Sequence, residues 1–344
     1  MSAATDFDVI PVHVLTGFLG SGKTSLLSRL LASEAFGDTA VLVNEFGEVG
    51  LDHLLLGEVA PDTLLLDSGC VCCTIRGELA DALRDLFSRR QRGELPAFRR
   101  VVLETTGLAE PAPILATLAA DPVIRHHFRL GGVVTVVDAL NALETHRHEP
   151  VWAEQLSAAD QLVLTKTDLV PAARAQQVRA QLAALNPLAP VTEACDDVLP
   201  IDEILPPARV ADGRLRPVTA RKAFYPAGAS KAAGGHRSGG HLAETASFCL
   251  EFDRQIDWTA FGLWLSLLLN RHGRNILRVK GLLHIEGSAT PVAIQGVQHV
   301  VHPPTHLSAW PDDERRSRLV FITRGLDART IEHSCAVFLR CLPV

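Results

Sequence analysis

The stretch Gly17-Phe18-Leu19-Gly20-Ser21-Gly22-Lys23-Thr24 decides the fold of this 344-residue chain. It matches the pattern G-x-x-x-x-G-K-[ST] at every fixed position. It follows an apolar run at Val9–Leu15, which predicts a strand, and precedes a predicted helix at Ser25–Ala32. Glycines let backbone N–H groups wrap around phosphates, and the N-terminus of the helix adds a favourable dipole. The stretch therefore predicts a phosphate-binding loop between a buried strand and a helix.

The residue types in this loop also predict individual roles. We expect Lys23 to reach the β- and γ-phosphates and the hydroxyl of Thr24 to bind Mg²⁺. The residues expected to contact the nucleotide are Gly17, Gly20, Ser21, Gly22, Lys23, Thr24 and Ser25. The loop alone does not say which nucleotide binds.

Further apolar runs continue the pattern that begins at Val9. The predicted strands are Val9–Leu15, Ala40–Val43, Val101–Leu103, Val133–Val137 and Gln161–Leu164. Helices are predicted at Ser25–Ala32 and at Glu78–Gln91, whose buried face carries Leu79, Leu83, Leu86 and Phe87. Continuous apolar strands that alternate with helices indicate a mainly parallel sheet covered on both faces. We expect an α/β nucleotide-binding domain over residues 1–205.

The composition changes after residue 205. Residues 206–246 are rich in glycine and proline and predict a flexible linker. Beyond it, strands are predicted at Ser247–Phe252, Ile276–Ile285, Val292–Val301 and Arg318–Thr323, and helices at Asp257–Asn270 and Ala328–Arg340. Asp257 is the expected cap of the first helix, and Trp258, Phe261, Leu265 and Leu268 form its expected buried face. Residues 247–344 thus predict a smaller α+β domain with a mostly antiparallel sheet.

The segment Thr165-Lys166-Thr167-Asp168 follows the predicted strand Gln161–Leu164. It resembles the guanine-reading element of GTPases, usually Asn-Lys-x-Asp, with Thr165 in place of the asparagine. The carboxylate of Asp168 can accept hydrogen bonds from the guanine N1–H and exocyclic amine, a donor pair that adenine does not present. The stem of Lys166 would pack over the base. The segment favours GTP over ATP.

A second acidic position follows the predicted strand Val101–Leu103. Glu104 stands where a carboxylate can hold Mg²⁺, as the acidic residue of the second motif of P-loop NTPases does. Gly107 resembles the glycine whose N–H senses the γ-phosphate. The predicted catalytic set is therefore Lys23, Thr24, Glu104 and Gly107. No residue is assigned to position the attacking water or to act as an arginine finger, so slow hydrolysis is expected without metal or a partner.

Charge and hydropathy narrow the class of protein. The chain has 33 Lys and Arg against 39 Asp and Glu and carries no basic block, which argues against nucleic acid as a partner. The sequence contains no run of 18 apolar residues that would predict a membrane span. It also lacks the basic and then apolar start that would predict a secretion signal. We expect a cytoplasmic protein.

Three of the seven cysteines, Cys70, Cys72 and Cys73, fall within four residues. Structural disulfides are rare in a reducing compartment, so this cluster favours a metal site or a redox group. Its thiolates can supply two or three ligands to a tetrahedral ion at about 2.3 Å. Neighbouring cysteines point apart, so the three need not bind together.

With these segments in place, the chain resembles the CobW-like, or cobalamin-synthesis protein, family of P-loop GTPases. The resemblance rests on the phosphate loop, the Cys-x-Cys-Cys spacing and segments of both predicted domains: Gly17–Thr24, Asn44–Asp52, Cys70–Cys73, Glu104–Pro111, Thr165–Asp168, Leu277–Gly281, Gln295–Val297 and Arg318–Ile322. It covers almost the whole chain.

The resemblance implies a GTP-hydrolysing metallochaperone that delivers an ion to a metal-requiring client protein. Zn²⁺ is favoured by the thiolates, but Co²⁺ binds similar ligands. Glu48 is the candidate for an additional ligand, since its loop at Asn44–Asp52 is the expected first switch and would couple GTP to metal affinity. The alternatives are a cobalt-insertion GTPase and a GTPase that senses zinc or redox state. A homodimer is a possible assembly, and His236 and His241 in the linker are possible further ligands.

Overall fold

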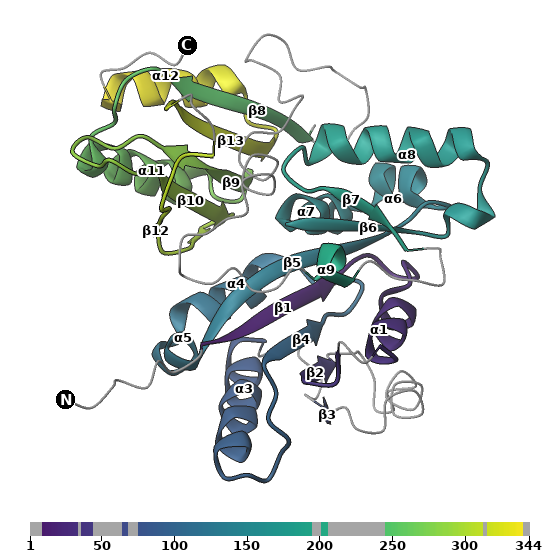
Figure 1. Cartoon of the computed structure of the whole chain (residues 1–344). Coiled ribbons are helices and arrows are strands. Elements are labelled where there is room, and N and C mark those ends of the chain that lie inside the picture. The colour runs from purple at the N-terminus through teal and green to yellow at the C-terminus, as the bar shows by residue number, and fades with distance from the viewer. Residues whose placement is uncertain are drawn as a thin grey trace, which may run out of the picture. The chain divides into compact units, whose positions relative to one another are not determined.

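The chain is described by a computed structural model at residues 9–33, 36–43, 64–67, 75–194, 201–205, 245–311 and 315–339 (Figure 1). The chain divides into two compact units. One comprises residues 1–138, 163–166 and 192–208, and the other comprises residues 139–162, 167–191 and 209–344. Nearly all of the predicted linker, residues 206–244, lies outside the described residues, so the domain limits at 205 and 246 stay predictions.

A mainly parallel sheet contains the predicted phosphate loop. Its strands are β1 (Ile10–Thr16), β2 (Thr39–Val43), β3 (Leu64–Asp67), β4 (Arg100–Glu104), β5 (Phe128–Asp138), β6 (Gln161–Thr165) and β7 (Val191–Glu193). They follow the order β3-β2-β4-β1-β5-β6-β7, and β1 pairs in parallel with both β4 and β5. Every residue of β1 is buried, as expected of a central strand covered on both faces.

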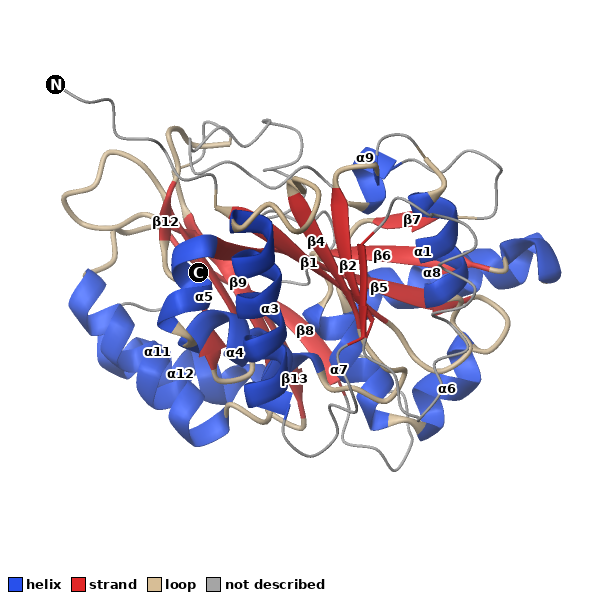
Figure 2. Ribbon diagram, turned by 90° about the horizontal axis from the view of Figure 1, so that it is seen from below, coloured by secondary structure: helices blue, strands red, loops and turns tan. Residues whose placement is uncertain are grey.

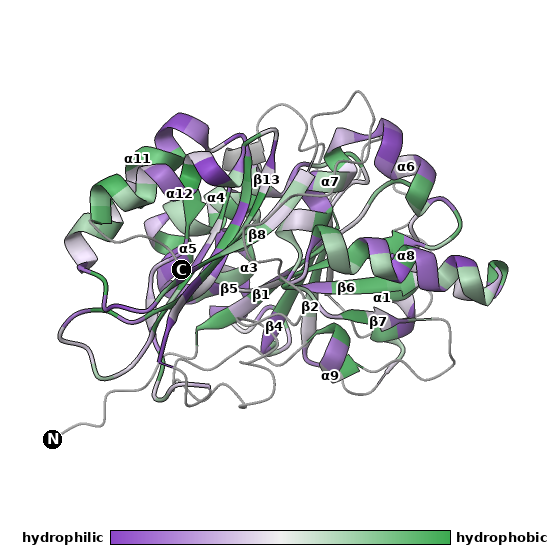
Figure 3. Ribbon diagram, turned by 90° about the horizontal axis from the view of Figure 1, so that it is seen from above, coloured by the Kyte–Doolittle hydropathy of each residue, from purple (hydrophilic) through white to green (hydrophobic). Residues whose placement is uncertain are grey.

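Helices connect these strands. They are α1 (Lys23–Leu31), α3 (Ile75–Gln91), α4 (Pro111–Ala120), α5 (Pro122–His127), α6 (Ala142–His148), α7 (Pro150–Ala158), α8 (Ala172–Leu185) and α9 (Ile201–Ile204), with a short 3-10 helix, η2, at Thr167–Leu169. Leucines of α1 share a core with β1, β2 and β5, whereas α3, α4 and α5 pack against one another (Figure 2). The hydrophilic and hydrophobic residues of α8 give the helix its purple and green segments in Figure 3, and its buried residues are Ala175, Val178 and Leu182.

The predicted α/β class is confirmed, and so are the five predicted strands. The strand predicted at Val133–Val137 is longer, because β5 begins at Phe128 and pairs with β1 through a register shift beside Gly132. The glycines at 131 and 132 interrupt the apolar run and so concealed this extension. The helix predicted at Glu78–Gln91 begins earlier, at Ile75, and Leu79, Leu83 and Leu86 are buried as expected, while Phe87 is half-buried.

The C-terminal part forms a second, antiparallel sheet, as predicted. Its strands are β8 (Thr245–Phe252), β9 (Ile276–Leu283), β10 (Val292–Val297), β11 (Val300–Val301), β12 (Thr305–His306) and β13 (Ser317–Arg324). They follow the order β11-β10-β9-β13-β8, with β12 paired to β10. The helices α11 (Trp258–His272) and α12 (Ala328–Leu339) share one apolar core with residues of β8, β9, β10 and β13.

The helix α11 confirms its predicted cap and corrects its predicted face. The carboxylate of Asp257 accepts a hydrogen bond of 2.6 Å from the backbone N–H of Ala260. Trp258 was predicted to be buried but is 41% exposed, because the core contacts α11 only from Phe261 onward. Trp264, which the prediction omitted, is 1% exposed.

In the described part of the chain, no helix has both the length and the apolar character that crossing a membrane requires.

Candidate nucleotide site

The predicted phosphate loop connects the carboxyl end of β1 to the first turn of α1. Gly22 caps α1 in a left-handed conformation, with φ +93°, and no side chain caps this helix. The loop is closed by a 3.1 Å hydrogen bond from the Ser21 N–H to the Phe18 carbonyl. A helix that begins after a glycine-rich turn, without a side-chain cap, directs its N-terminal amides at the loop, which is the arrangement that phosphate binding uses.

Two glycines of the predicted site stand where no side chain fits. A Cβ atom on Gly17, whose φ is +146°, would lie 2.3 Å from the carbonyl oxygen of Val136. A Cβ atom on Gly107 would lie 2.6 Å from the backbone nitrogen of Leu19. Gly107 therefore lies directly against the phosphate loop, at a position suited to the γ-phosphate sensing predicted for it.

The ammonium of Lys23 lies within the loop. Its Nζ donates hydrogen bonds to the carbonyls of Gly17 at 3.0 Å and Phe18 at 3.3 Å, and the residue is buried. The Ser21 hydroxyl is also buried and has no hydrogen-bond partner among the described residues. A buried cation beside a buried hydroxyl suits a loop that receives an anionic ligand.

Thr24 and Glu104, the two predicted magnesium ligands, contact each other. The Thr24 hydroxyl donates a 2.8 Å hydrogen bond to Oε1 of Glu104, although the two residues lie 80 positions apart in the chain. Glu104 is only 4% exposed and ends β4, which pairs beside β1. Hydroxyl and carboxylate oxygens are hard donors of the kind that Mg²⁺ prefers, so this pair fits the ion.

The predicted base-reading segment meets the phosphate loop at the end of β6. The Thr165 hydroxyl donates to the Ser21 carbonyl at 2.7 Å and to the Val137 carbonyl at 3.2 Å. This hydroxyl fastens the loop even though threonine replaces the usual asparagine. Asp168 follows in the 3-10 helix η2 and is exposed.

Asp138 is a residue of this edge that the sequence prediction missed. It ends β5 and is largely buried, and its carboxylate Oδ2 pairs with the Nζ of Lys166 at 2.7 Å. The signal was present, since Asp138 directly follows the predicted strand Val133–Val137 just as Glu104 follows Val101–Leu103. Ligands of parallel sheets bind at the carboxyl ends of the strands, so the reasoning that assigned Glu104 to the site applies equally to Asp138.

The predicted transition-metal ligands Cys70, Cys72, Cys73 and Glu48 lie outside the described residues, as do His236 and His241. Among the described residues, no group of three or more His, Cys, Asp or Glu side chains is placed to hold a metal ion. Two other cysteines are described. Cys335 is buried, and burial raises the pKa of the Cys249 thiol to about 12, which makes that thiol a poor metal ligand.

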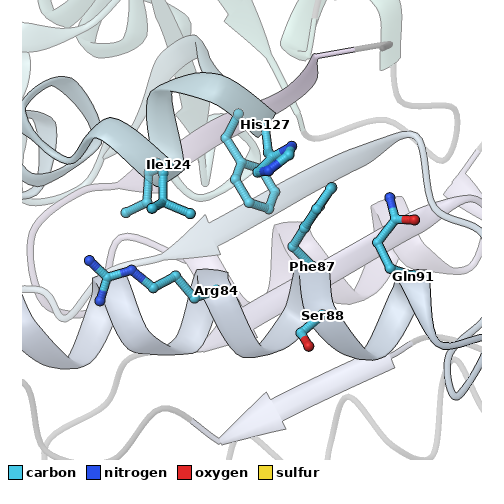
Figure 4. A pocket seen from close by; sticks show the side chains of 8 residues that line it. Arg84, Phe87, Ser88, Gln91, Ile124 and His127 are labelled. Atoms are coloured by element: carbon cyan, nitrogen blue, oxygen red, sulfur yellow. The ribbon is translucent and has the colours of Figure 1, made fainter. Parts of the chain in front are cut away.

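A pocket lies elsewhere in the same unit (Figure 4). Side chains of α3, α5 and β5 line it, among them Arg84, Phe87 and His127. The rings of Phe87 and His127 stack with centroids 3.8 Å apart. Phe128, the first residue of β5, also lines the pocket, which therefore lies at the amino end of the strand. The nucleotide residues lie at the carboxyl ends, so this pocket is not part of the candidate site.

Two family models match the chain. The one described as "CobW/HypB/UreG, nucleotide-binding domain" matches residues 11–193, and the one described as "Cobalamin synthesis protein cobW C-terminal domain" matches residues 245–339.

The chain is also similar to named proteins and to a solved structure. The zinc chaperone YjiA of Escherichia coli is 33% identical over 91% of this chain and 93% of its own length. Zinc-regulated GTPase metalloprotein activator 1 of Schizosaccharomyces pombe is 38% identical over 54% of this chain and 46% of its own. The crystal structure of the Zn(II)-bound YjiA GTPase from E. coli matches with a TM-score of 0.68 and 29% identity, and the match covers 96% of this chain and 98% of the other.

Proposed function

Because this chain belongs to the CobW/HypB/UreG family and carries its nucleotide-binding domain, we propose that it is a GTP-hydrolysing metallochaperone. In this proposal it binds a transition metal, zinc in the first place, through Cys70, Cys72 and Cys73, and transfers the ion to a metal-requiring client protein. The names of the two relatives, a zinc chaperone and a zinc-regulated GTPase, support the activity and the metal.

The observation that carries the nucleotide part is the contact between Thr24 and Glu104. It brings the two predicted magnesium ligands within 2.8 Å of each other, one on the first turn of α1 and one at the end of β4. Bound there, Mg²⁺ would neutralise charge on the phosphate oxygens. A plain glycine-rich turn would give no reason for a buried carboxylate to face the threonine of the loop.

The side chains of the chain divide the remaining work. Lys23 would turn from the Gly17 and Phe18 carbonyls to the β- and γ-phosphates, where its charge stabilises the transferred group. The amide of Gly107 would donate to the γ-phosphate and report whether it is present. Asp168 would accept hydrogen bonds from guanine. Since no residue is assigned to orient the attacking water, we expect slow turnover that metal or a client accelerates.

The metal part of the proposal rests on the sequence and the family. Three thiolates within four residues form a soft ligand set, and Glu48 is the proposed additional ligand. The segment Asn44–Asp52 would couple the two sites, so that metal affinity differs between the GTP and GDP states. That difference is what delivery requires.

Zinc titration of the full chain tests the coupling. The protein is titrated with Zn²⁺ in the presence of Mg²⁺ with either GDP or a non-hydrolysable GTP analogue, against a competing chromophoric chelator. We expect Cys72→Ser to weaken zinc binding about 100-fold or more in either state. The same variant should bind fluorescent GTP normally. Cys249→Ser is the matched control and should titrate as the unmodified chain does.

Unchanged zinc affinity and stoichiometry in Cys72→Ser would refute the cysteine site. Equal zinc affinity with GDP and with the GTP analogue would refute the coupling. If zinc binds but GTP never affects its transfer to an apo-client, the chain acts as a sensor instead. A parallel titration with Co²⁺ compares the cobalt alternative on the same protein.

A further inference from the structure

A second acidic residue at the nucleotide edge holds the side chain of Lys166. The Lys166 Nζ donates two hydrogen bonds of 2.7 Å, one to the Asp138 carboxylate and one to the Gly20 carbonyl. The side chain of Asp138 is 8% exposed and that of Lys166 is 32% exposed. One ammonium thus connects the end of β5 to the outer turn of the phosphate loop.

The backbone of Lys166 is adapted to this position. Its φ is +58°, and it is one of two described residues other than glycine with a positive φ. Residues other than glycine, asparagine and aspartate rarely adopt this conformation, because the Cβ atom crowds the backbone. Such a conformation persists where the surroundings hold it in place. The two hydrogen bonds of the ammonium and that of the neighbouring Thr165 hydroxyl to the Ser21 carbonyl supply the hold.

The three strands that contribute to this arrangement meet at one edge. β1 and β5 pair up to the contact of Thr16 with Thr135, and the Gly17 backbone packs against Val136 two residues before Asp138. The residue after β6 reaches back to both. Asp138 is therefore built into the same rigid edge as the phosphate loop, and its carboxylate is fixed before any ligand arrives.

We propose that Asp138 is a positioning residue for the nucleotide, which acts by holding the Lys166 stem where it packs on the guanine base. The proposal rests on the proposed binding of GTP. The charge of Asp138 holds the ammonium between the end of β5 and the Gly20 carbonyl, against the attraction of the triphosphate. A lysine released from Asp138 would sample many rotamers, and ordering it again would oppose binding.

The base and its lysine contact are common to GTP and GDP, so loss of Asp138 should not change the preference between the two nucleotides. Loss of the Asp138 carboxylate should weaken both nucleotides by the same factor and leave hydrolysis at saturating GTP unchanged. KM rises while kcat stays constant, because the lost interaction serves the ground state and the transition state equally. A residue needed only for folding would instead reduce the active fraction and so lower kcat.

A double-mutant cycle on the full chain with Mg²⁺ tests this claim. Fluorescent GTP and GDP are titrated against the unmodified chain, Asp138→Asn, Lys166→Met and the double variant, and GTP turnover is followed for each. We expect Asp138→Asn to weaken both nucleotides about tenfold, the size expected for one charge-assisted hydrogen bond. In the Lys166→Met background the same change should alter affinity less than about twofold.

Two further variants serve as controls, one for folding and one for the general effect of removing a carboxylate. Asp138→Glu keeps the carboxylate and should bind within about threefold of the unmodified chain, even if Asp138→Asn folds poorly. Asp81→Asn removes a carboxylate that pairs with Arg84 at 2.8 Å on the exposed surface of α3 and should bind normally.

The possible outcomes distinguish failure of this inference from failure of the proposed function. Normal nucleotide binding by Asp138→Asn, or a full tenfold loss in the Lys166→Met background, would overturn the positioning role while the proposed function stands. Failure of the unmodified chain to bind either nucleotide would overturn the proposed function and this inference with it.

Discussion

The parallel sheet and the antiparallel sheet use buried charge in different places. In the parallel sheet, Glu104 and Asp138 are the last residues of β4 and β5, and Lys166 directly follows β6. In the antiparallel sheet, Arg278 and Lys280 stand within β9, and both are almost completely buried. Strand ends open onto loops and ligands, whereas the middle of a strand faces only neighbouring protein.

The partners of these charges differ accordingly. Arg278 donates to the Ala158 carbonyl and pairs with Asp160, which also binds Lys280 at 3.1 Å. Successive residues of a strand point to opposite faces, so Val279 joins the apolar core with α11 while Arg278 and Lys280, on either side of it, point to the other face. We infer that the cations of β9 hold structure and that the charges at the parallel strand ends serve the nucleotide. This contrast predicts that variants in the two groups affect different measurements.

The largest effect is expected for Lys23→Ala. The variant loses the ammonium that the loop presents to the phosphates, so GTP affinity should fall about a thousandfold, two to three charge-assisted contacts being removed. The free energy of unfolding should fall less than in a variant of the β9 cations, because the hydrogen bonds of Lys23 to Gly17 and Phe18 have neutral acceptors. Fluorescent GTP titration and thermal unfolding measure the two effects. Arg99→Ala removes an 86%-exposed cation before β4 and should bind GTP normally. Tight GTP binding by Lys23→Ala would contradict the site.

Arg278→Met should show the reverse pattern. The change removes two buried hydrogen bonds, one of them to the Asp160 carboxylate, and should lower the free energy of unfolding by about 2–3 kcal/mol. GTP affinity should stay within about twofold. Urea unfolding gives the stability, and Arg147→Met, which removes an exposed ion pair with Glu144, should cost less than about 0.5 kcal/mol. A loss of GTP affinity without a loss of stability would erase the distinction between the two sheets.

The sequence predicted the fold class because the strands are continuous and apolar. Ile10–Thr16 and Thr39–Val43 are buried at every position, and such runs need no tertiary information to recognise. It predicted none of the helices from α4 to α9. Each of α4 and α7 has a proline at its first position, and their buried residues surround much of the helix, so neither shows a clear amphipathic pattern. Which helix covers which face depends on contacts between distant segments.

The same dependence on distant contacts limits how much of the candidate site the sequence predicts. The phosphate loop and Glu104 were found because local spacing marks them, and the 2.8 Å contact between Thr24 and Glu104 agrees with that reasoning. Asp138 follows a predicted strand just as Glu104 does, but its neighbours in the sequence do not reveal its partner. Its importance comes from Lys166, 28 positions later, which only the folded sheet brings to it. Long-range pairs of this kind need coordinates.

A third prediction concerns how stability depends on pH through His302, which interacts with the β9 charge cluster of Arg278, Lys280 and Asp160. Burial, and then the positive charges of Arg278 and Lys280, lower the pKa of His302 to about 4, against the opposing effect of Asp160. Between pH 6.5 and pH 4 the unfolded chain therefore binds a proton at His302 that the folded chain does not. The free energy of unfolding should fall with pH by about 1.4 kcal/mol per unit in this window, or about 2 kcal/mol at pH 5.

Urea unfolding at pH 7 and pH 5 measures this loss, and His302→Gln supplies the comparison. The variant cannot take up the proton, so its stability should fall about 2 kcal/mol less over the same interval. Identical slopes for the two proteins would mean that burial and the β9 cations do not lower the pKa of His302. GTP affinity at pH 7 should be the same in both, since the cluster belongs to the structural group of charges.

The smallest effect is expected for Trp258→Ala, and it sharpens the comparison by testing the apolar side of the antiparallel sheet. Trp258 is 41% exposed and stacks on Phe261 with ring centroids 6.2 Å apart, one turn before the core begins. Removing it should lower the free energy of unfolding by about 1 kcal/mol, since only part of the ring leaves contact with protein. A loss above about 3 kcal/mol, the range for a fully buried tryptophan, would place Trp258 in the core after all. Because helical spacing assigned Trp258 to the buried face, a small loss would show that this spacing fails where a helix extends beyond its core.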